Sequence, residues 1–166
     1  MNNKLFTAIA LASALALGAC KSTAPKELPP EPTAPPPTET ATGPMPGSHA
    51  DFVAKMAGRD VIYFDTDQYN IDSEDAAALQ GQAQWLLQYP NKRATIEGHC
   101  DERGTRDYNL ALGERRANAA KNYLVSLGID ANRLSTVSYG KERPVAMGSD
   151  EGAWAQNRRA ATITID

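Results

Sequence analysis

The sequence predicts an α/β (α+β) domain of the two-layer sandwich type, with two long helices on one face of a mixed sheet of about four strands. Two β-prone runs are each followed by a helical pattern, and two further β-prone runs come after the second helix, which gives the order βαβαββ. A proline-rich segment precedes these elements and lacks the apolar residues that a core needs. The domain is therefore expected to occupy residues 51–166.

The first unit of the domain is a strand followed by a helix. Residues 61–64 read Val-Ile-Tyr-Phe and predict a strand, after a helical turn or two at 51–58. Ser73 can cap the helix that follows a polar loop. Apolar residues recur at helical spacing up to Tyr89, and Pro90 prevents the helix from continuing.

The second unit repeats this order. Residues 93–97 alternate apolar and polar side chains and predict a strand. The next helix begins near residues 107–109 and ends at Gly128, a residue well suited to a C-terminal cap. The sheet is completed by strands at 134–139 and 160–165, which are joined by a long loop at 141–157 with a helical turn around Trp154.

The N-terminus predicts a lipoprotein signal peptide at residues 1–19. A single positive charge precedes an apolar run from Leu5 to Gly18, which is too short for a lasting membrane span of about 30 Å. Leu17-Gly18-Ala19 before Cys20 resembles a bacterial lipobox, in which the cysteine becomes acylated. By analogy with lipoprotein sorting, Lys21 in place of aspartate implies the outer membrane. An ordinary signal peptide with an incidental Cys20 is the alternative.

Residues 20–50 predict a disordered tether that begins at the lipidated cysteine. Nine of the eleven prolines fall between Pro25 and Pro46, among threonine, alanine and glutamate. Such a segment buries too little apolar surface to offset its ordering entropy. An extended spacer of roughly thirty residues reaches at most about 90 Å. A proline-rich ligand for a recognition domain is the alternative interpretation.

Charge and cysteine content exclude two classes of interpretation. The net charge is −3 and the pI is about 5.4, which argues against a nucleic-acid partner, because phosphate binding needs a basic face. One of the two cysteines lies in the N-terminal segment and the other in the central loop, so no disulfide is predicted.

The segment 95–120 carries the strongest functional motif, a charged loop between a strand and a helix. Loops lie at the surface and are aimed by the elements that they connect, so they are well placed to meet a ligand. From about residue 60 to the C-terminus the chain resembles the OmpA-like peptidoglycan-binding domains, and within them the peptidoglycan-associated lipoproteins. The matching motif residues are Gly98, His99, Asp101, Gly104, Thr105, Tyr108, Asn109, Leu112, Gly113, Arg116 and Ala117.

Three charged residues are the predicted binding site: Asp67 after the first strand, Asp101 after the second, and Arg116 in the following helix. The resemblance implies that they hold meso-diaminopimelate of the peptidoglycan stem peptide. Its ammonium suits a carboxylate, and its carboxylate suits a bidentate guanidinium. Thr105, Asn109 and Leu112 match neighbours of that pocket. The structural alternatives are that Asp101 pairs with Arg116 or caps its own loop.

His99 and Cys100 permit a rival interpretation as a thiol or metal enzyme that remodels peptidoglycan. Adjacent residues at the end of a strand point to opposite faces, so His99 is poorly placed to deprotonate Cys100. A metal site would need more ligands, and neither a metal nor a cofactor is expected. The Asn157-Arg158-Arg159 run also matches the family and is interpreted mainly as structural.

The resemblance implies a function without catalysis, so the chain is not expected to be an enzyme. It implies non-covalent binding of peptidoglycan by a lipid-anchored domain that faces the periplasm and links the outer membrane to the cell wall. It also implies a TolB-like periplasmic protein as partner, in a Tol-Pal system that maintains the envelope during cell division.

Overall fold

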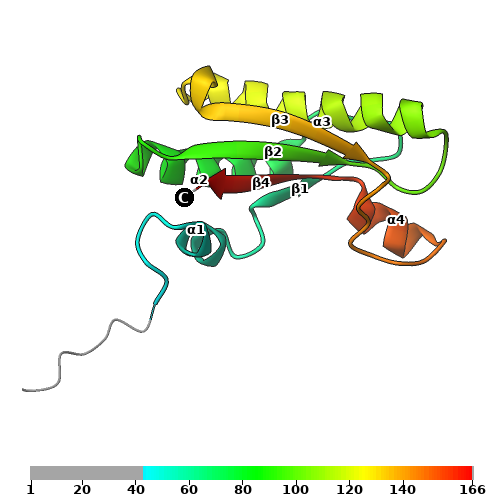
Figure 1. Ribbon diagram of the computed structural model, residues 1–166, viewed down its shortest axis with the longest axis horizontal. Helices are drawn as coiled ribbons and strands as arrows, with labels where there is room; N and C mark the ends of the chain where they lie inside the picture. Colours follow the sequence, from blue (N-terminus) through cyan, green and yellow to red (C-terminus); the bar gives the residue numbers. More distant parts are fainter. Residues whose placement is uncertain (1–42, 166) are drawn as a thin grey trace, which may run out of the picture. The chain divides into compact units, whose positions relative to one another are not determined.

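The computed structural model describes residues 43–165, so the predicted signal peptide, Cys20 and most of the predicted tether lie outside the described residues. In chain order the elements are α1 (His49–Met56), β1 (Val61–Tyr63), α2 (Ser73–Gln88), β2 (Arg93–His99), α3 (Arg106–Ser126), the 3-10 turn η1 (Ala131–Arg133), β3 (Leu134–Gly140), α4 (Glu151–Asn157) and β4 (Arg159–Ile165) (Figure 1).

The sheet is mixed, and its strands lie in the order β1-β4-β2-β3. Strands β2 and β3 are parallel, whereas β4 is antiparallel to both of its neighbours, β1 and β2. The helices α2 and α3 lie on the same side of this sheet (Figure 1). The predicted two-layer sandwich is therefore confirmed. Because β1, β2 and β3 run in one direction, the loops that follow them emerge at the same edge of the sheet.

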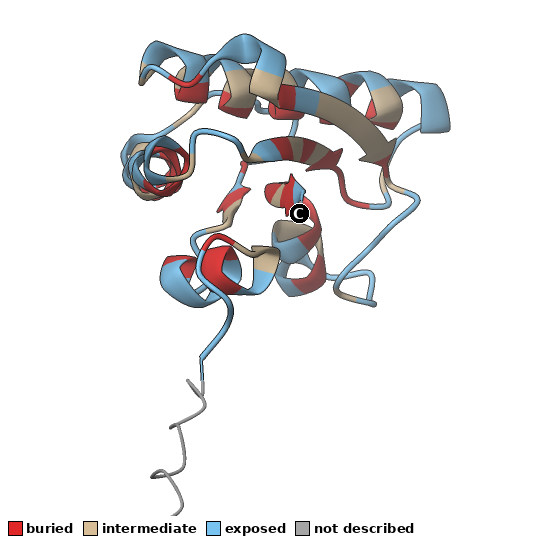
Figure 2. Cartoon of the chain, turned by 60° about the vertical axis from the view of Figure 1, so that its left-hand side comes forward, coloured by how far each residue is buried: buried red, intermediate tan, exposed pale blue. Residues whose placement is uncertain are grey.

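The core lies between the sheet and its helices, as the burial colours in Figure 2 show. Ala94 and Ile96 of β2 are buried, while Thr95 and Glu97 on the other face are only partly buried, as their alternation predicts. Phe52 from α1 meets the Trp85 ring from α2 at a centroid distance of 5.0 Å. Helix α1 is therefore part of the same core.

The N-terminal boundary of the domain lies before residue 51. Helix α1 begins at His49, with Ser48 as its N-cap. The Asp51 carboxylate then accepts hydrogen bonds from the Gly47 backbone and from the Trp85 indole, both at 3.0 Å. These two bonds lower the pKa of Asp51, with the Gly47 bond contributing most. Residues 47–49 are thus tied to the folded domain.

The cap of α2 differs from the prediction. Asp72, and not Ser73, occupies the N-cap, and its carboxylate accepts from the backbone N–H groups of Glu74 and Asp75 at 2.8 Å each. The Asp75 side chain accepts in return from the Asp72 backbone, which completes a capping box. Aspartate is as good a cap as serine, so sequence alone could not distinguish the two adjacent candidates.

The end of α3 follows the prediction. Gly128 has a φ of 95°, a left-handed conformation that favours glycine. Its N–H donates to the Val125 carbonyl, and the N–H of Ile129 donates to the Leu124 carbonyl. This is the Schellman arrangement, in which the last carbonyls of a helix find donors. It turns the chain towards β3.

Helix α3 approaches β2 closely at two glycines. A Cβ atom on Gly98 would overlap the carbonyl oxygen of Gly113, and one on Gly113 would overlap the Ser138 hydroxyl. The Ser138 hydroxyl also donates to the Leu110 carbonyl of α3 at 2.7 Å. The absence of side chains at the two glycines therefore sets the distance between helix and sheet, and with it the position of the N-terminal end of α3.

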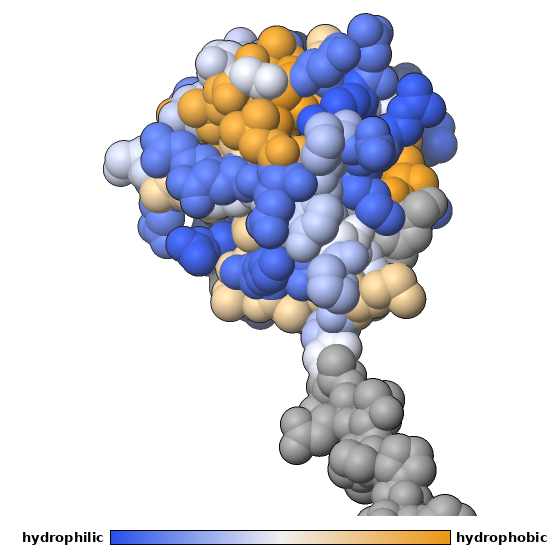
Figure 3. Space-filling model, turned by 90° about the vertical axis from the view of Figure 1, so that its left-hand side faces the viewer, coloured by the Kyte–Doolittle hydropathy of each residue, from blue (hydrophilic) through white to orange (hydrophobic). Residues whose placement is uncertain are grey.

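A hydrophobic area appears on the face of the domain shown in Figure 3. Leu87 of α2 is 54% exposed and lines a shallow groove of about 210 Å³ together with Ala83 and Leu127. Within residues 43–165, no helix has the length and apolar character needed to cross a bilayer.

Candidate functional site

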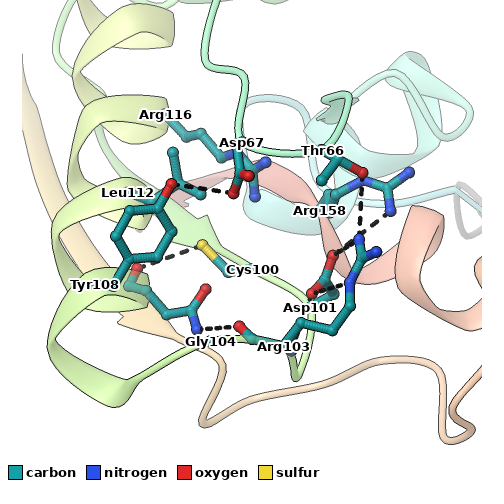
Figure 4. Close-up of a pocket in the computed structure, with 11 residues that line it drawn as sticks. Thr66, Asp67, Cys100, Asp101, Arg103, Gly104, Tyr108, Leu112, Arg116 and Arg158 are labelled. Carbon is teal, nitrogen blue, oxygen red and sulfur yellow. Dashed lines mark hydrogen bonds and ion pairs between the residues drawn. The ribbon is translucent and has the colours of Figure 1, made fainter.

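A cavity of about 250 Å³ opens where the loops after β1 and β2 meet the N-terminal part of α3. Figure 4 shows Asp67, Leu112 and Arg116 on one side of it, and Thr66, Asp101, Arg103 and Arg158 on the other. The full lining consists of Thr66, Asp67, Cys100, Asp101, Arg103, Gly104, Tyr108, Asn109, Leu112, Arg116 and Arg158. Five of the six residues predicted to bind a ligand thus line a single cavity.

The loops that carry Asp67 and Asp101 converge on this one cavity. Strands β1 and β2 are not neighbours, because β4 lies between them. Since β4 is antiparallel to both, β1 and β2 still point the same way, and the loops that carry Asp67 and Asp101 emerge at one edge. Helix α3 starts at this edge and brings Arg116 to the cavity from the side.

Asp101 is a buried carboxylate whose partners are arginines of its own loop and of α4's C-cap. Its Oδ1 accepts from the backbone N–H and from Nε of Arg103, at 3.0 and 3.1 Å. Its Oδ2 accepts from Nη2 of Arg103 at 2.7 Å and lies 3.5 Å from Nη1 of Arg158. Burial alone would raise the pKa of Asp101, but the contacts with Arg103 and Arg158 lower it overall. Asp101 is thus ionised at neutral pH.

Asp67 lies opposite Asp101 in a strained backbone conformation. Its φ is 58°, which is uncommon for a residue other than glycine and occurs often at functional sites. The Tyr108 hydroxyl donates to Oδ1 of Asp67 at 3.0 Å, and this bond raises the pKa of the Tyr108 phenol. Among the described residues, no ion pair with a guanidinium or ammonium group is recorded for Asp67, in contrast to Asp101.

Arg116 is fully buried and holds the loop after β1 in place. Its Nε donates to the Gln68 carbonyl at 2.8 Å, its Nη1 to the His99 carbonyl at 2.8 Å, and its Nη2 to the Asp65 carbonyl at 3.0 Å. An arginine has five N–H groups, so these three bonds leave two N–H groups for a ligand. Burial lowers the pKa of Arg116, yet an arginine remains charged at neutral pH.

The two structural alternatives for Asp101 have different outcomes. Among the described residues, no hydrogen bond or ion pair joins Asp101 to Arg116, whose guanidinium donates to three backbone carbonyls. Asp101 does cap its loop, because Oδ1 accepts the Arg103 N–H two residues further on. The same Asp101 side chain thus caps its loop and lines the cavity.

The remaining predicted residues form the wall beside α3. Leu112 and Asn109 line the cavity, and the Asn109 amide donates to the carbonyls of Arg103 at 2.7 Å and Thr105 at 3.0 Å. Thr105 does not line the cavity. It is the N-cap of α3, and its hydroxyl accepts from the Tyr108 N–H at 3.3 Å. Thr105 therefore positions its neighbours and does not itself face the cavity.

His99 and Cys100 have different partners. The thiol of Cys100 donates to the Asn109 carbonyl at 3.3 Å and lines the cavity, and burial raises its pKa. His99 instead stacks on the Tyr139 ring at 5.5 Å. The thiol is therefore protonated at neutral pH, and the described contacts give it no base. Between residues 43 and 165, no cluster of three or more His, Cys, Asp or Glu residues could hold a metal ion.

Sequence reasoning did not assign Thr66, Arg103 and Tyr108 to the site, and it interpreted Arg158 as mainly structural. Arg158 does have structural bonds, because its Nε donates to the Phe64 carbonyl at 2.9 Å and its Nη2 pairs with Glu151 at 2.7 Å. Its Nη1 is buried without a hydrogen-bond partner and lies beside Asp101. The position of Arg103 and Tyr108 inside the central motif was the available signal.

Comparison with known proteins places the chain in a family. The model of the OmpA family matches residues 63–158. The chain is 57% identical over 118 residues to the peptidoglycan-associated lipoprotein of Rhizobium meliloti, with 71% of this chain and 66% of that protein aligned. It is 55% identical over 117 residues to the peptidoglycan-associated lipoprotein of Mesorhizobium japonicum, with 70% of this chain and 68% of that protein aligned.

Solved structures agree with these relatives. The crystal structure of the peptidoglycan-associated lipoprotein from Burkholderia pseudomallei matches with a TM-score of 0.62 and 47% identity, over 63% of this chain and 89% of that one. The C-terminal domain of Helicobacter pylori MotB matches with a TM-score of 0.59 and 19% identity, over 64% of this chain and 84% of that one, and so shares the fold. The chain therefore belongs to the OmpA family and, within it, to the peptidoglycan-associated lipoproteins.

Proposed function

We propose that the chain binds peptidoglycan non-covalently, through the diaminopimelate of the stem peptide. The cavity supports this function because it combines carboxylates and guanidiniums, of which Asp101, Arg116 and Arg158 are buried. Asp101 is the proposed partner of the ligand ammonium, and Arg116, through the two N–H groups that no carbonyl accepts, is the proposed partner of the ligand carboxylate. Asp67 adds a second carboxylate on the opposite wall, which favours the ammonium further.

The wider role is a mechanical link without catalysis. A lipid anchor on Cys20 holds the protein in the outer membrane, the tether spans the gap, and the domain binds the cell wall from the periplasmic side. Membership in the family supports a TolB-like periplasmic protein as a second partner, in a Tol-Pal system that acts in envelope integrity and cell division. The protonated thiol of Cys100 and its separation from the His99 ring weigh against a peptidoglycan-remodelling enzyme.

Titration calorimetry with three stem tripeptides tests the ligand assignment. One peptide carries meso-diaminopimelate, one carries diaminopimelate with its side-chain carboxylate converted to a carboxamide, and one carries lysine. All three keep the side-chain ammonium, but only the first keeps the side-chain carboxylate. Leaving a charge unpaired in such a pocket costs about 2–5 kcal/mol. Wild-type protein is therefore expected to prefer the first peptide by roughly thirtyfold or more.

Two variants test which residue binds the ligand carboxylate and which binds the ligand ammonium. Arg116→Lys keeps the charge but loses the bidentate fork, so the preference for the diaminopimelate peptide should largely disappear. Asp101→Ala should weaken all three peptides alike, because all of them carry the ammonium. Arg115→Ala is the matched control, since Arg115 is exposed on α3 and its guanidinium lies 5.6 Å from the Tyr69 ring centre, outside the cavity.

Stability has to be measured beside affinity, because Arg116 also holds the Gln68 and Asp65 carbonyls. A folded Arg116→Lys protein that keeps the full wild-type preference would show that another residue binds the carboxylate. Incubation with purified sacculi distinguishes the remaining possibilities. Retention in the pellet without soluble fragments supports binding, whereas released muropeptides would indicate an enzyme and no retention would indicate a purely protein-binding module.

A further inference from the structure

Arg103 makes a contact with Asp101 that the proposed function, on which this inference rests, does not explain. Its guanidinium forms a two-pronged ion pair with Asp101, through Nε to Oδ1 at 3.1 Å and Nη2 to Oδ2 at 2.7 Å. Figure 4 shows this pair at the rim of the cavity, with Arg103 reaching from the loop to both Asp101 and Thr66. The carboxylate that is proposed to receive the ligand ammonium is therefore already paired.

The pair with Arg103 conflicts with ammonium binding, because Asp101 can accept only a limited number of hydrogen bonds. A carboxylate offers about four acceptor positions on its two oxygens. Arg103 takes three of them with its backbone N–H, Nε and Nη2, and Nη1 of Arg158 lies 3.5 Å from Oδ2 at the remaining side. An ammonium ion needs one or more of these positions. Only the position beside Arg158 carries no hydrogen bond, so an ammonium that makes two bonds to Asp101 has to replace a side-chain bond from Arg103.

Of the two arginines, Arg103 is the one that can leave. The side chain of Arg158 is only 7% exposed and also bonds the Phe64 carbonyl and Glu151, so its movement would strand a buried charge. The side chain of Arg103 is 38% exposed. Its guanidinium carbon already lies 4.2 Å from the centre of the Trp154 ring while it is paired with Asp101, and this cation–π contact can persist when the pair breaks.

We propose that the Arg103 guanidinium is an internal competitor for the ligand ammonium, and that ligand binding displaces it from Asp101 towards solvent while its contact with Trp154 is kept. In the free protein it keeps a buried carboxylate paired. On binding, the ligand ammonium takes over the positions of Nε and Nη2, while the backbone N–H of Arg103 stays on Oδ1 and keeps the loop in shape. The observed affinity is then the intrinsic affinity reduced by the competing pair.

Titration of Arg103→Ala with the diaminopimelate and lysine tripeptides tests the proposal. Removing a competing charge-assisted pair should tighten binding of both peptides by roughly tenfold, because both present an ammonium. Arg106→Ala is the matched control. Arg106 also carries one positive charge, and its side chain is 66% exposed and pairs with Glu142 at 3.3 Å, away from the cavity lining. It corrects for the general effect of removing one positive charge from the domain.

The possible outcomes separate this inference from the proposed function. If the wild type binds the peptides and Arg103→Ala binds them no more tightly than Arg106→Ala does, the competitor role is overturned. The proposed function is then still intact. A wild type that binds neither peptide nor sacculi overturns both.

Nitrogen-15 NMR of the wild type gives a second readout that needs no variant. The Arg103 Nε–H resonance should shift on addition of the diaminopimelate peptide, and an unshifted resonance in a saturated complex would contradict displacement.

Discussion

His99 is a histidine that the fold keeps neutral. It is 1% exposed, and neither ring nitrogen has a hydrogen-bond partner, although Nε2 lies 3.6 Å from a Glu97 oxygen. One face of the ring is stacked on Tyr139. Burial, followed by the charges of Arg159 and Arg143, lowers the pKa of His99 to about 4. In the unfolded chain a histidine has a pKa of about 6.5. Between this pH and about 4, His99 therefore binds a proton in the unfolded chain but not in the folded domain.

This difference predicts acid sensitivity in a defined window. Because the folded pKa is below the unfolded one, stability is lost as the pH falls from about 6.5 towards 4. Between pH 7 and pH 5 the free energy of unfolding should fall by about 2 kcal/mol through this residue. Urea denaturation of His99→Leu at both pH values should show a smaller fall than the wild type. Identical pH dependence of His99→Leu and wild type would rule out His99 as the source.

Three of the five charged residues that line the cavity could be predicted, but their pairing could not. Asp67 and Asp101 follow strands and Arg116 lies on the next helix, so position and residue type identified them. Whether Asp101 pairs with Arg116 or with another arginine depends on where each side chain points, and this is set by three-dimensional packing. Arg103 pairs with Asp101 two residues before it in a loop where the next residue, Gly104, has a φ of 83°. That geometry is invisible in a residue pattern.

At the scale of elements, the contact between α3 and β2 depends on two glycines. Gly98→Ala and Gly113→Ala should each destabilise the domain, at the upper end of about 1–3 kcal/mol, because the added Cβ overlaps the backbone across the contact or the Ser138 hydroxyl. The measurement is the free energy of unfolding by urea. Since α3 also carries cavity residues, peptide affinity should fall in any variant that still folds.

Gly81 provides the control for these substitutions. It lies inside α2, and a Cβ there would meet no atom closer than the Met56 sulfur at 3.9 Å. Gly81→Ala is therefore expected to stabilise the domain by about 0.5–1 kcal/mol through helix propensity. If all three substitutions had the same effect, close approach would not be the reason for glycine at positions 98 and 113.

The elements themselves could largely be predicted, because their signals are local. The helix ends at Pro90 and Gly128 follow from backbone geometry, and the strands follow from β-prone runs. The order of the strands could not be predicted in this way. The insertion of β4 between β1 and β2 joins residues that are distant in the chain, such as Ile62 and Ala160, and no local pattern encodes that pairing.

At the scale of the whole molecule, a domain that binds the cell wall links the wall to the outer membrane only if the N-terminal end of the chain is fixed in that membrane. A single acyl chain holds a protein to a membrane marginally, whereas two or more signals anchor it stably. The proposed lipidation of Cys20 would supply several chains on one residue. The tether's reach of at most about 90 Å would then let a domain that is anchored at one membrane touch a nearby wall.

Cys20→Ala should separate anchoring from binding. Without the thiol there is no acylation, so the variant should remain an uncleaved precursor or become soluble, while its domain still sediments with purified sacculi because the cavity is untouched. Lys21→Asp is the comparison, since it keeps the lipid and, by the sorting analogy, should retain the protein at the inner membrane. Membrane fractionation with detergent extraction measures all three forms. A Cys20→Ala protein that is still processed and still found in the outer membrane would mean that the anchor lies elsewhere, and the tether would then begin at a different residue.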